Sequence, residues 1–208
     1  MKLSRFYLLA VMLVTGSQCL NGEESVKRRD DLRRFTERNE DKLLNHLRSV
    51  LKAADLTAVS YIFTKSKKVT VTRGGSGHIR ILVGDVSDEL LKTKISVVTF
   101  KPSERYNAQE AIIPIIRAKE VQAKLRKLGL EQPLTALSGF MQEPNPRFPH
   151  LPASMKNVTM EEALDRVAQT FSGLIIYGEW TADGTHLFSV DFAWIANFEA
   201  HSQSSKKR

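Results

Sequence analysis

The chain is poor in the residues that build disulfides, metal sites and membrane spans. Its 208 residues include one cysteine, Cys19, which excludes an intramolecular disulfide framework and any metal site made of several cysteines. The five histidines are scattered, and no two are spaced four residues apart as in a helical zinc site. The longest apolar run, residues 6–14, is less than half of the roughly 20 residues that a membrane-spanning helix needs. The sequence therefore predicts neither a metal site nor a membrane span.

Motifs of common catalytic mechanisms are also missing. There is no Gly-x-Ser-x-Gly nucleophile motif. The glycine-rich stretch Gly74–Gly77 lacks the Lys-Ser/Thr pair of a phosphate-binding loop, and a strand-like run rather than a helix follows it. We therefore expect a protein that is not an enzyme, with no catalytic residue, cofactor or metal. One alternative stays open: an exported hydrolase with an unfamiliar site near His186 and Asp191, beside a turn at Asp183.

The first residues have the pattern of a secretory signal peptide. Lys2 and Arg5 precede the apolar run 6–14, and small residues suited to cleavage follow it. We expect a leader of residues 1–19, cut between about residues 16 and 22. The sequence thus predicts an exported protein, periplasmic or extracellular.

Cys19 follows the apolar run, as the lipidated cysteine of a bacterial lipoprotein would. A lipobox, however, has an aliphatic residue three places before the cysteine and a small residue directly before it. Here those places hold Gly16 and Gln18. Anchoring as a lipoprotein through Cys19 is therefore not favoured.

The balance of charge is basic, and the composition is that of a globular protein. Hydrophobic residues make up 42% and charged residues 26%, and 31 Lys and Arg against 23 Asp and Glu give a net charge of +8. Loss of Lys2 and Arg5 with the leader lowers this to +6. Such an excess is compatible with anionic partners of several kinds.

The densest basic surface is predicted on a helix over residues 115–128. Its candidate anion-binding residues are Arg117, Lys119, Lys124, Arg126 and Lys127. Together with the basic tail they suggest an alternative function, a secreted protein that binds anionic lipid, a cell-wall polymer or nucleic acid. Nucleic acid is the least favoured of these partners. A solvated helix face is the plainer interpretation of the same residues.

The mature chain divides into five predicted parts. They are a charged amphipathic helix (23–55), an α+β region with a hairpin and the basic helix (56–130), a proline-rich linker or crossing (131–151), a helix with a hairpin (152–196), and a disordered basic tail (197–208). The fold class expected is α+β, with helices packed on small antiparallel sheets.

In the first α+β region, β-branched residues alternate in 57–64 and 69–72 before the glycine-rich stretch, and in 78–83 after it. This pattern predicts a β-hairpin. A later helix is expected to start at a capping box formed by Asn107 and Glu110 and to end at Gly129, with Pro114 either kinking it or standing in its first turn.

The C-terminal region has the clearest pattern. Thr159 and Glu162 form a capping box, an apolar stripe follows, and Gly173 is expected to end the helix. Residues 174–180 and the alternating residues up to Trp194 are predicted strands. The Asp183-Gly184 pair between them is typical of a hairpin turn.

The stretch KNVTMEEALD at residues 156–165, followed by GLIIY at 173–177, resembles the short N-terminal (STN) domain of secretins and TonB-dependent receptors, over about residues 151–195. Members of that family carry a strand, a Val-Thr-x-x-Glu-Ala-Leu helix and an aliphatic strand, and they act in periplasmic signalling or assembly contacts. The resemblance implies a protein-binding unit. We therefore expect an exported, non-enzymatic bacterial envelope protein that acts as a protein-interaction module, with another envelope protein as its partner.

Overall fold

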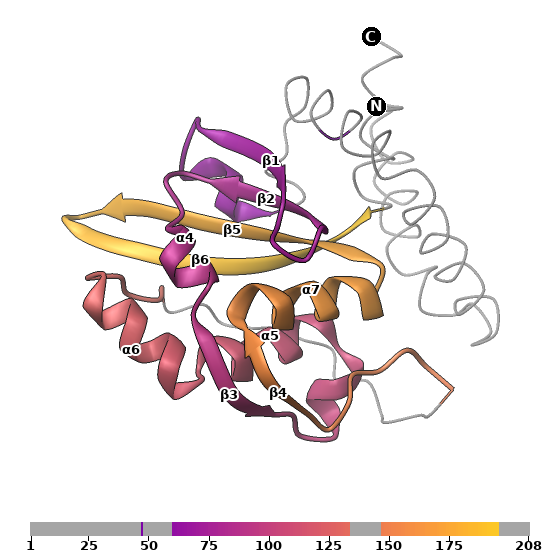
Figure 1. Cartoon of the computed structure of the whole chain (residues 1–208). Coiled ribbons are helices and arrows are strands. Elements are labelled where there is room, and N and C mark those ends of the chain that lie inside the picture. The colour runs from indigo at the N-terminus through magenta and orange to yellow at the C-terminus, as the bar shows by residue number, and fades with distance from the viewer. Residues whose placement is uncertain (1–46, 48–59, 134–146, 196–208) are drawn as a thin grey trace, which may run out of the picture.

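Two sheets and four α-helices make up the part of the chain that the computed structural model describes, which is Leu47 and residues 60–133 and 147–195. The larger sheet has the strand order β1-β2-β5-β6, and the smaller one pairs β3 with β4 (Figure 1). The strands are β1 (Val69–Arg73), β2 (Ile79–Val83), β3 (Lys94–Thr99), β4 (Ser154–Thr159), β5 (Gly173–Ala182) and β6 (Thr185–Trp194). The α+β class expected from the sequence is confirmed.

The hairpin predicted around the glycine-rich stretch is confirmed as β1 and β2, which pair antiparallel from Val69 opposite Val83 to Arg73 opposite Ile79. Gly77 has a φ of 86°, a conformation that glycine adopts without steric cost. The strand-like pattern before β1 was misleading, because Tyr61–Thr64 forms the 3-10 helix η2. The Ser60 side chain accepts a hydrogen bond from the Ile62 amide and so starts a helical turn in place of a strand.

The second predicted hairpin is also confirmed, with β5 and β6 paired antiparallel over their whole length. Asp183 and Gly184 both have positive φ, at 51° and 76°, as a two-residue turn of this kind requires. Strand β2 pairs with β5 in parallel, from Arg80 opposite Ile175 to Val83 opposite Gly178. This pair makes the four-stranded sheet mixed, whereas the sequence pattern suggested antiparallel sheets.

Strands β3 and β4 form a two-stranded ribbon with a break in its alternation. Each strand has two exposed residues in succession, Ser96 and Val97 on β3 and Lys156 and Asn157 on β4. Asn157 has a φ of 50°, and the regular pairing skips Ser96 opposite it. This local irregularity turns both Val97 and its partner Lys156 outward.

The predicted basic helix 115–128 is not one helix, which corrects the sequence analysis. Helix α5 (Ala108–Ile116) starts at Asn107, whose side chain accepts hydrogen bonds from the amides of Gln109 and Glu110. Pro114 lies inside α5, so the alternative prediction, a helix that begins there, is wrong. The break comes at Ala118, whose extended backbone separates α5 from α6 (Lys119–Lys127).

Helix α7 (Met160–Thr170) begins as predicted and ends differently. Thr159 and Glu162 form a complete capping box. Ser172, with a φ of 53°, takes the left-handed position after the helix, and Gly173 is already the first residue of β5. The glycine is needed there for a different reason, since a Cβ at Gly173 would collide with the ring of Phe192.

Alternate residues of β5 face two separate hydrophobic cores. Ile175 and Tyr177 belong to the larger core, which they share with helices α4 (Asp88–Leu91), α5, α6 and α7 and with the ribbon. Leu174 and Ile176 belong to the smaller core, which contains Leu47 and residues of η2, β1 and β2. The labelled helices and the ribbon thus cover one face of the four-stranded sheet (Figure 1).

Several predictions concern residues outside the described part of the chain. These are the leader 1–19 with Cys19, the amphipathic helix 23–55 apart from Leu47, residues 134–146 of the proline-rich stretch, and the tail 197–208. In the described part, no helix has the length and apolar character needed to cross a membrane.

Candidate functional site

The five basic residues predicted to bind anions lie on two elements. Arg117 follows the end of α5, and the other four are on α6. Lys124 differs from the rest because it is partly buried and its Nζ lies 3.2 Å from Glu89 Oε2. The other four are exposed and form no ion pair with another residue of the described part: Arg117, Lys119, Arg126 and Lys127.

The exposed cations of α6 project from one side of the helix. Lys119 precedes Arg126 and Lys127 by seven and eight residues, which places all three on the same face. Glu120 points elsewhere and is occupied, since its Oε1 accepts a hydrogen bond from the Ser96 amide at 3.1 Å. Hydrogen bonding from Ser96 lowers the pKa of the Glu120 carboxyl below its ordinary value. The acid in the first turn of α6 therefore fixes the helix to β3. Its attraction to Lys119 is the smallest contribution to its lowered pKa, and Arg126 and Lys127 form no ion pair in the described part of the chain.

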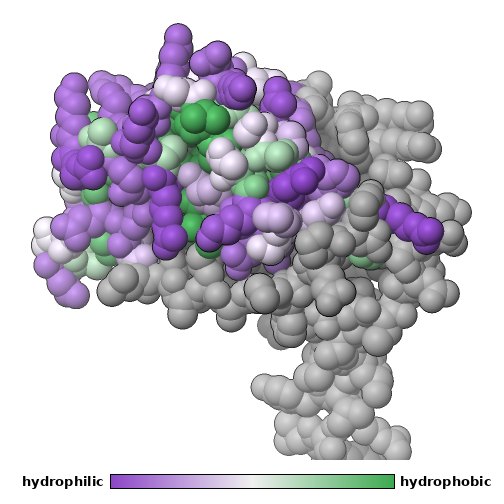
Figure 2. Space-filling view, turned by 90° about the horizontal axis from the view of Figure 1, so that it is seen from below, coloured by the Kyte–Doolittle hydropathy of each residue, from purple (hydrophilic) through white to green (hydrophobic). Residues whose placement is uncertain are grey.

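The ribbon extends this positive surface. Lys94 and Lys156 are exposed on β3 and β4, and Val97, half exposed at 50%, lies opposite Lys156. Seen from below, this side of the molecule is covered mainly by hydrophilic residues, with smaller apolar areas between them (Figure 2). We call the following set the basic face: Lys94, Val97, Arg117, Lys119, Arg126, Lys127 and Lys156.

A separate polar pocket lies near the turn of the β5–β6 hairpin. It has a volume of about 280 Å³ and is lined by Lys65, Ser66, Gly84, Asp85, Glu179, Trp180, Thr181 and His186. Glu179 is only 8% exposed, and burial raises the pKa of its carboxyl, against the opposing effects of the Ser87 amide and His186. Its two oxygens bind the Ser87 amide at 3.2 Å and His186 Nε2 at 3.0 Å. The buried acid of this pocket is thus already satisfied by the protein itself.

His186 and Asp191, suggested above as part of a hydrolase site, do not come together. They are five residues apart on the extended strand β6, a separation of about 17 Å. His186 pairs with Glu179, whereas Asp191 accepts a hydrogen bond from Gln109 at 2.9 Å. Asp183 lies in the hairpin turn and is exposed.

A second group of charges is buried beneath the glycine-rich loop Gly74–Gly77. Arg80 of β2 is 9% exposed and forms an ion pair with Glu161, which is 3% exposed. Asp165, one turn further along α7, is also 3% exposed and accepts a hydrogen bond from the Ser76 hydroxyl. We call Arg80, Glu161, Asp165 and the nearby Tyr177 the buried cluster.

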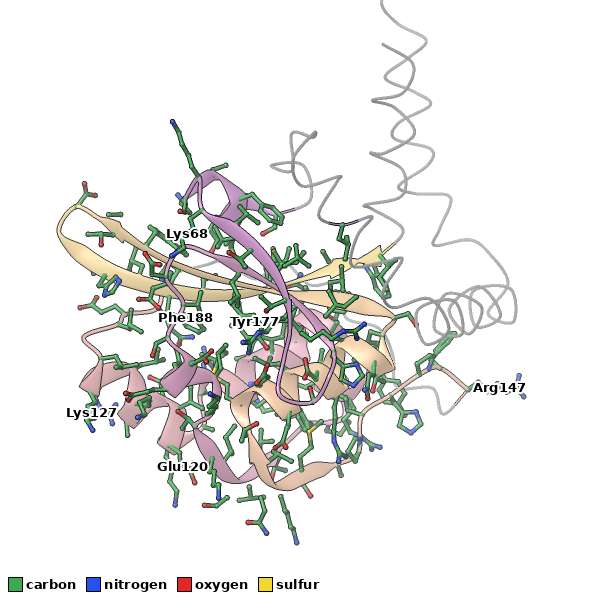
Figure 3. All side chains as sticks on the ribbon, turned by 45° about the horizontal axis from the view of Figure 1, so that its top comes forward. Lys68, Glu120, Lys127, Arg147, Tyr177 and Phe188 are labelled. Carbon is green, nitrogen blue, oxygen red and sulfur yellow. The ribbon has the colours of Figure 1, made fainter. Side chains whose placement is uncertain are left out.

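The electrostatics of the buried cluster are unusual for its residue types. The pKa of Asp165 is raised to about 7, mainly by burial and also by the neighbouring Glu161, while Arg80 acts to lower it. Tyr177 lies in the middle of the fold (Figure 3), and its hydroxyl has no hydrogen-bond partner. Burial, together with Asp165 and Glu161, raises the pKa of Tyr177 well above 10. These side chains therefore share one low-dielectric space.

Sequence reasoning missed the buried cluster, although part of its signal was present. Glu161 and Asp165 are spaced four residues apart beside the apolar stripe of α7, and neither has a basic residue three or four positions away on the helix. The loop Gly74–Gly77 lacks the Lys-Ser/Thr pair of a phosphate-binding loop. In the structure its Gly75 amide donates to Glu161 Oε1 at 3.2 Å, so the anion it holds is a carboxylate of the same chain.

The fold and these sites define an α+β protein with an exposed basic face and an internal carboxylate pair. Among the residues that the structure describes, no group of three or more His, Cys, Asp or Glu side chains is placed to hold a metal ion. No family model matches the chain, and no curated protein and no solved structure matches it either.

Proposed function

We propose that this chain is an exported, non-enzymatic protein-interaction module of the bacterial envelope, and that it binds an acidic surface of its partner through the basic face. The observation that carries the proposal is the row of exposed cations on α6 next to the ribbon, where Val97 is half exposed opposite Lys156. The STN-like pattern of residues 151–195 and the leader pattern of residues 1–19 support the envelope setting.

Three acids near the basic face are engaged within the chain, which leaves most of its cations available to a partner. Glu120 binds the Ser96 amide, Glu89 pairs with Lys124, and Asp88 lies 3.3 Å from Lys92 and 3.4 Å from Arg80. Long-range attraction between such a face and an acidic surface speeds association and selects the partner. This favours recognition over catalysis at this surface.

Val97 distinguishes a protein partner from a simple polyanion. Interfaces between proteins commonly have an apolar centre within a polar rim. An exposed valine directly opposite Lys156 on the neighbouring strand fits that pattern, whereas a phosphate-rich polymer would gain little from it. The second candidate function, binding of anionic lipid or a cell-wall polymer by the same cations, therefore predicts no dependence on Val97.

The experiment measures retention of envelope proteins on the immobilised mature protein by quantitative mass spectrometry. The test variant is Lys119→Glu/Lys127→Glu, in which one change lies in the first turn and one in the last turn of α6, so that effects on the helix dipole offset each other. The control is Lys67→Glu/Arg166→Glu, which alters the net charge equally at exposed sites on η2–β1 and α7. Val97→Ser is the third variant.

We expect a specific partner to be retained about tenfold less by the test variant and by Val97→Ser, and to be unaffected by the control. If the control loses as much as the test variant, binding depends on net charge alone and the proposal fails. If Val97→Ser binds normally and the protein also binds vesicles of anionic lipid, the second candidate function holds instead.

A further inference from the structure

The loop Gly74–Gly77 lies directly against two buried carboxylates. The Gly75 amide donates to Glu161 Oε1, and the Ser76 hydroxyl donates to Asp165 Oδ2. The backbone of Gly74 is so close to Glu161 that a Cβ on residue 74 would overlap its carboxylate. Gly75, Ser76 and Gly77 are exposed, while both carboxylates are buried. The loop is therefore a thin cover between these acids and the solvent.

Arg80 compensates one of the two acids. Its Nη1 pairs with Glu161, its Nη2 lies 3.4 Å from Asp88 and its Nε donates to Thr72 at 3.2 Å. Asp165 instead accepts a hydrogen bond from the neutral hydroxyl of Ser76. With both acids ionised, the buried cluster holds one negative charge more than Arg80 neutralises.

The other groups around Asp165 are directed elsewhere or are not cations. The imidazole of His78, which follows the loop, contacts Gln169 one turn further along α7, and the Arg73 guanidinium donates to the Gly77 carbonyl at 3.2 Å. On its own helix, Glu161 and Glu162 both repel a carboxylate at residue 165. Beneath it, β5 contributes the buried and neutral hydroxyl of Tyr177. Helix α5, which packs against α7, buries only apolar residues. From α4, Asp88 faces Arg80 and adds a further acid.

We propose that the loop Gly74–Gly77 is a pH-dependent cover, closed over Asp165 while that side chain is protonated and increasingly open as the pH rises toward neutrality. Opening lets water hydrate the carboxylate pair. It exposes Arg80, Glu161 and Asp165 at the end of the sheet next to the N-terminus of α7. The device is independent of the partner-binding role proposed for the basic face, which involves none of these residues.

The direction follows from proton linkage. In the closed form the pKa of Asp165 is about 7, whereas a hydrated aspartate has a pKa near its ordinary value of 3.8. At a pH between these two pKa values, opening of the loop releases a proton from Asp165. A rise in pH therefore favours the open loop. Above about pH 7 the closed form is ionised as well, so the effect levels off. The loop has three glycines and no buried apolar side chain, which keeps the packing lost on opening small.

The test is amide hydrogen exchange in the loop, measured by NMR on the whole mature protein from pH 5 to pH 7.5 and corrected for intrinsic exchange rates. Gly74 and Gly77 are the reporters, since their amides donate to His78 and Gly74 carbonyls in the closed loop. We expect their protection to fall about tenfold or more over this range in the wild type. In Asp165→Asn the protection should change less than about twofold.

Asp183→Asn is the matched control, because residue 183 is an exposed turn position with positive φ that asparagine accepts readily. It should retain the pH dependence of the wild type. Ser76→Ala provides a second route if Asp165→Asn does not fold. This change removes the hydroxyl that donates to Asp165. It should lower the protection of the loop amides at pH 5, where the wild-type loop is closed.

The NMR chemical shift of the Asp165 carboxyl carbon, followed against pH in the wild type, measures directly whether the pKa of this side chain is raised. A titration midpoint below pH 5, or loop protection that stays constant with pH in the wild type, would overturn the proposal. Pronounced pH dependence that persists in Asp165→Asn would also overturn it, because another group would then control the loop.

Discussion

The basic face and the buried cluster both concentrate charge, and they differ in what the charges contact. On the basic face, Lys119 and Lys127 are surrounded by water, where single charges contribute little to folding free energy. In the buried cluster, Arg80 and Glu161 have lost that water and depend on each other. Similar residue types therefore contribute little to the folding free energy in one region and are tied to the folded conformation in the other.

The largest effect that this comparison predicts is for Arg80→Ala. The change leaves Glu161 and Asp165 buried without a cation, and we expect the free energy of unfolding to fall by about 3–5 kcal/mol at pH 7. Urea denaturation measures it. Lys68→Ala, which breaks the exposed pair with Asp85, should cost less than about 1 kcal/mol. Equal losses in the two variants would contradict the distinction between the regions.

The next effect is the pH dependence contributed by Asp165. Because its folded-state pKa is raised from 3.8 to about 7, its protonated form stabilises the fold at acid pH. This contribution is lost as the pH rises from about 4 through 7, and it amounts to at most about 4 kcal/mol. The stability of Asp165→Asn relative to the wild type should therefore increase with pH over this window in denaturation curves. A constant difference would show that Asp165 is already ionised throughout the window.

An intermediate effect is expected at the start of α7. There the polar Thr159 is half-buried and the charged Glu162 is exposed. Thr159→Ala removes the acceptor for the Glu162 amide, a bond of 3.1 Å, and should lower stability by about 1 kcal/mol. Thermal unfolding measures it, and Arg166→Ala, on the exposed side of the same helix, should shift stability by less than about 0.5 kcal/mol. A similar loss in both variants would argue against a capping effect.

The smallest change in stability is expected on the basic face. Lys119→Ala/Lys127→Ala should alter the free energy of unfolding by less than about 0.5 kcal/mol, since neither side chain pairs with the described part of the chain. The same substitutions should weaken partner binding and reduce its dependence on salt. A loss of more than about 1 kcal/mol would show that Lys119 and Lys127 stabilise the fold, contrary to this prediction.

Local features were predictable from the sequence and long-range contacts were not. The Thr159 capping box and the Asp183-Gly184 turn depend on neighbours within three residues, so both were found. The pair between Arg80 and Glu161 joins residues 81 positions apart and has no local signal. The sequence also could not show that β2 would pair in parallel with β5, because that choice depends on how the helices cover the sheet.

The errors in the sequence analysis have a common physical cause. Ser60 caps a short helix where β-branched residues suggested a strand, and Ser172 adopts the positive φ expected of Gly173. Lys119 and Arg117 were placed on one helix, yet the extended backbone of Ala118 separates their elements. In each case one residue's backbone conformation decided the boundary, whereas periodicity describes only the interior of an element.

The parallel pairing of β2 with β5 also has a kinetic consequence. These two central strands are separated by about 90 residues of chain, and the last strand, β6, ends at Trp194. The four-stranded sheet therefore cannot be completed until synthesis has passed Trp194, and closing so long a loop slows folding. Until β5 has been synthesised, the edge of β2 that will pair with it is unpaired, and this edge can form incorrect pairs with other strands.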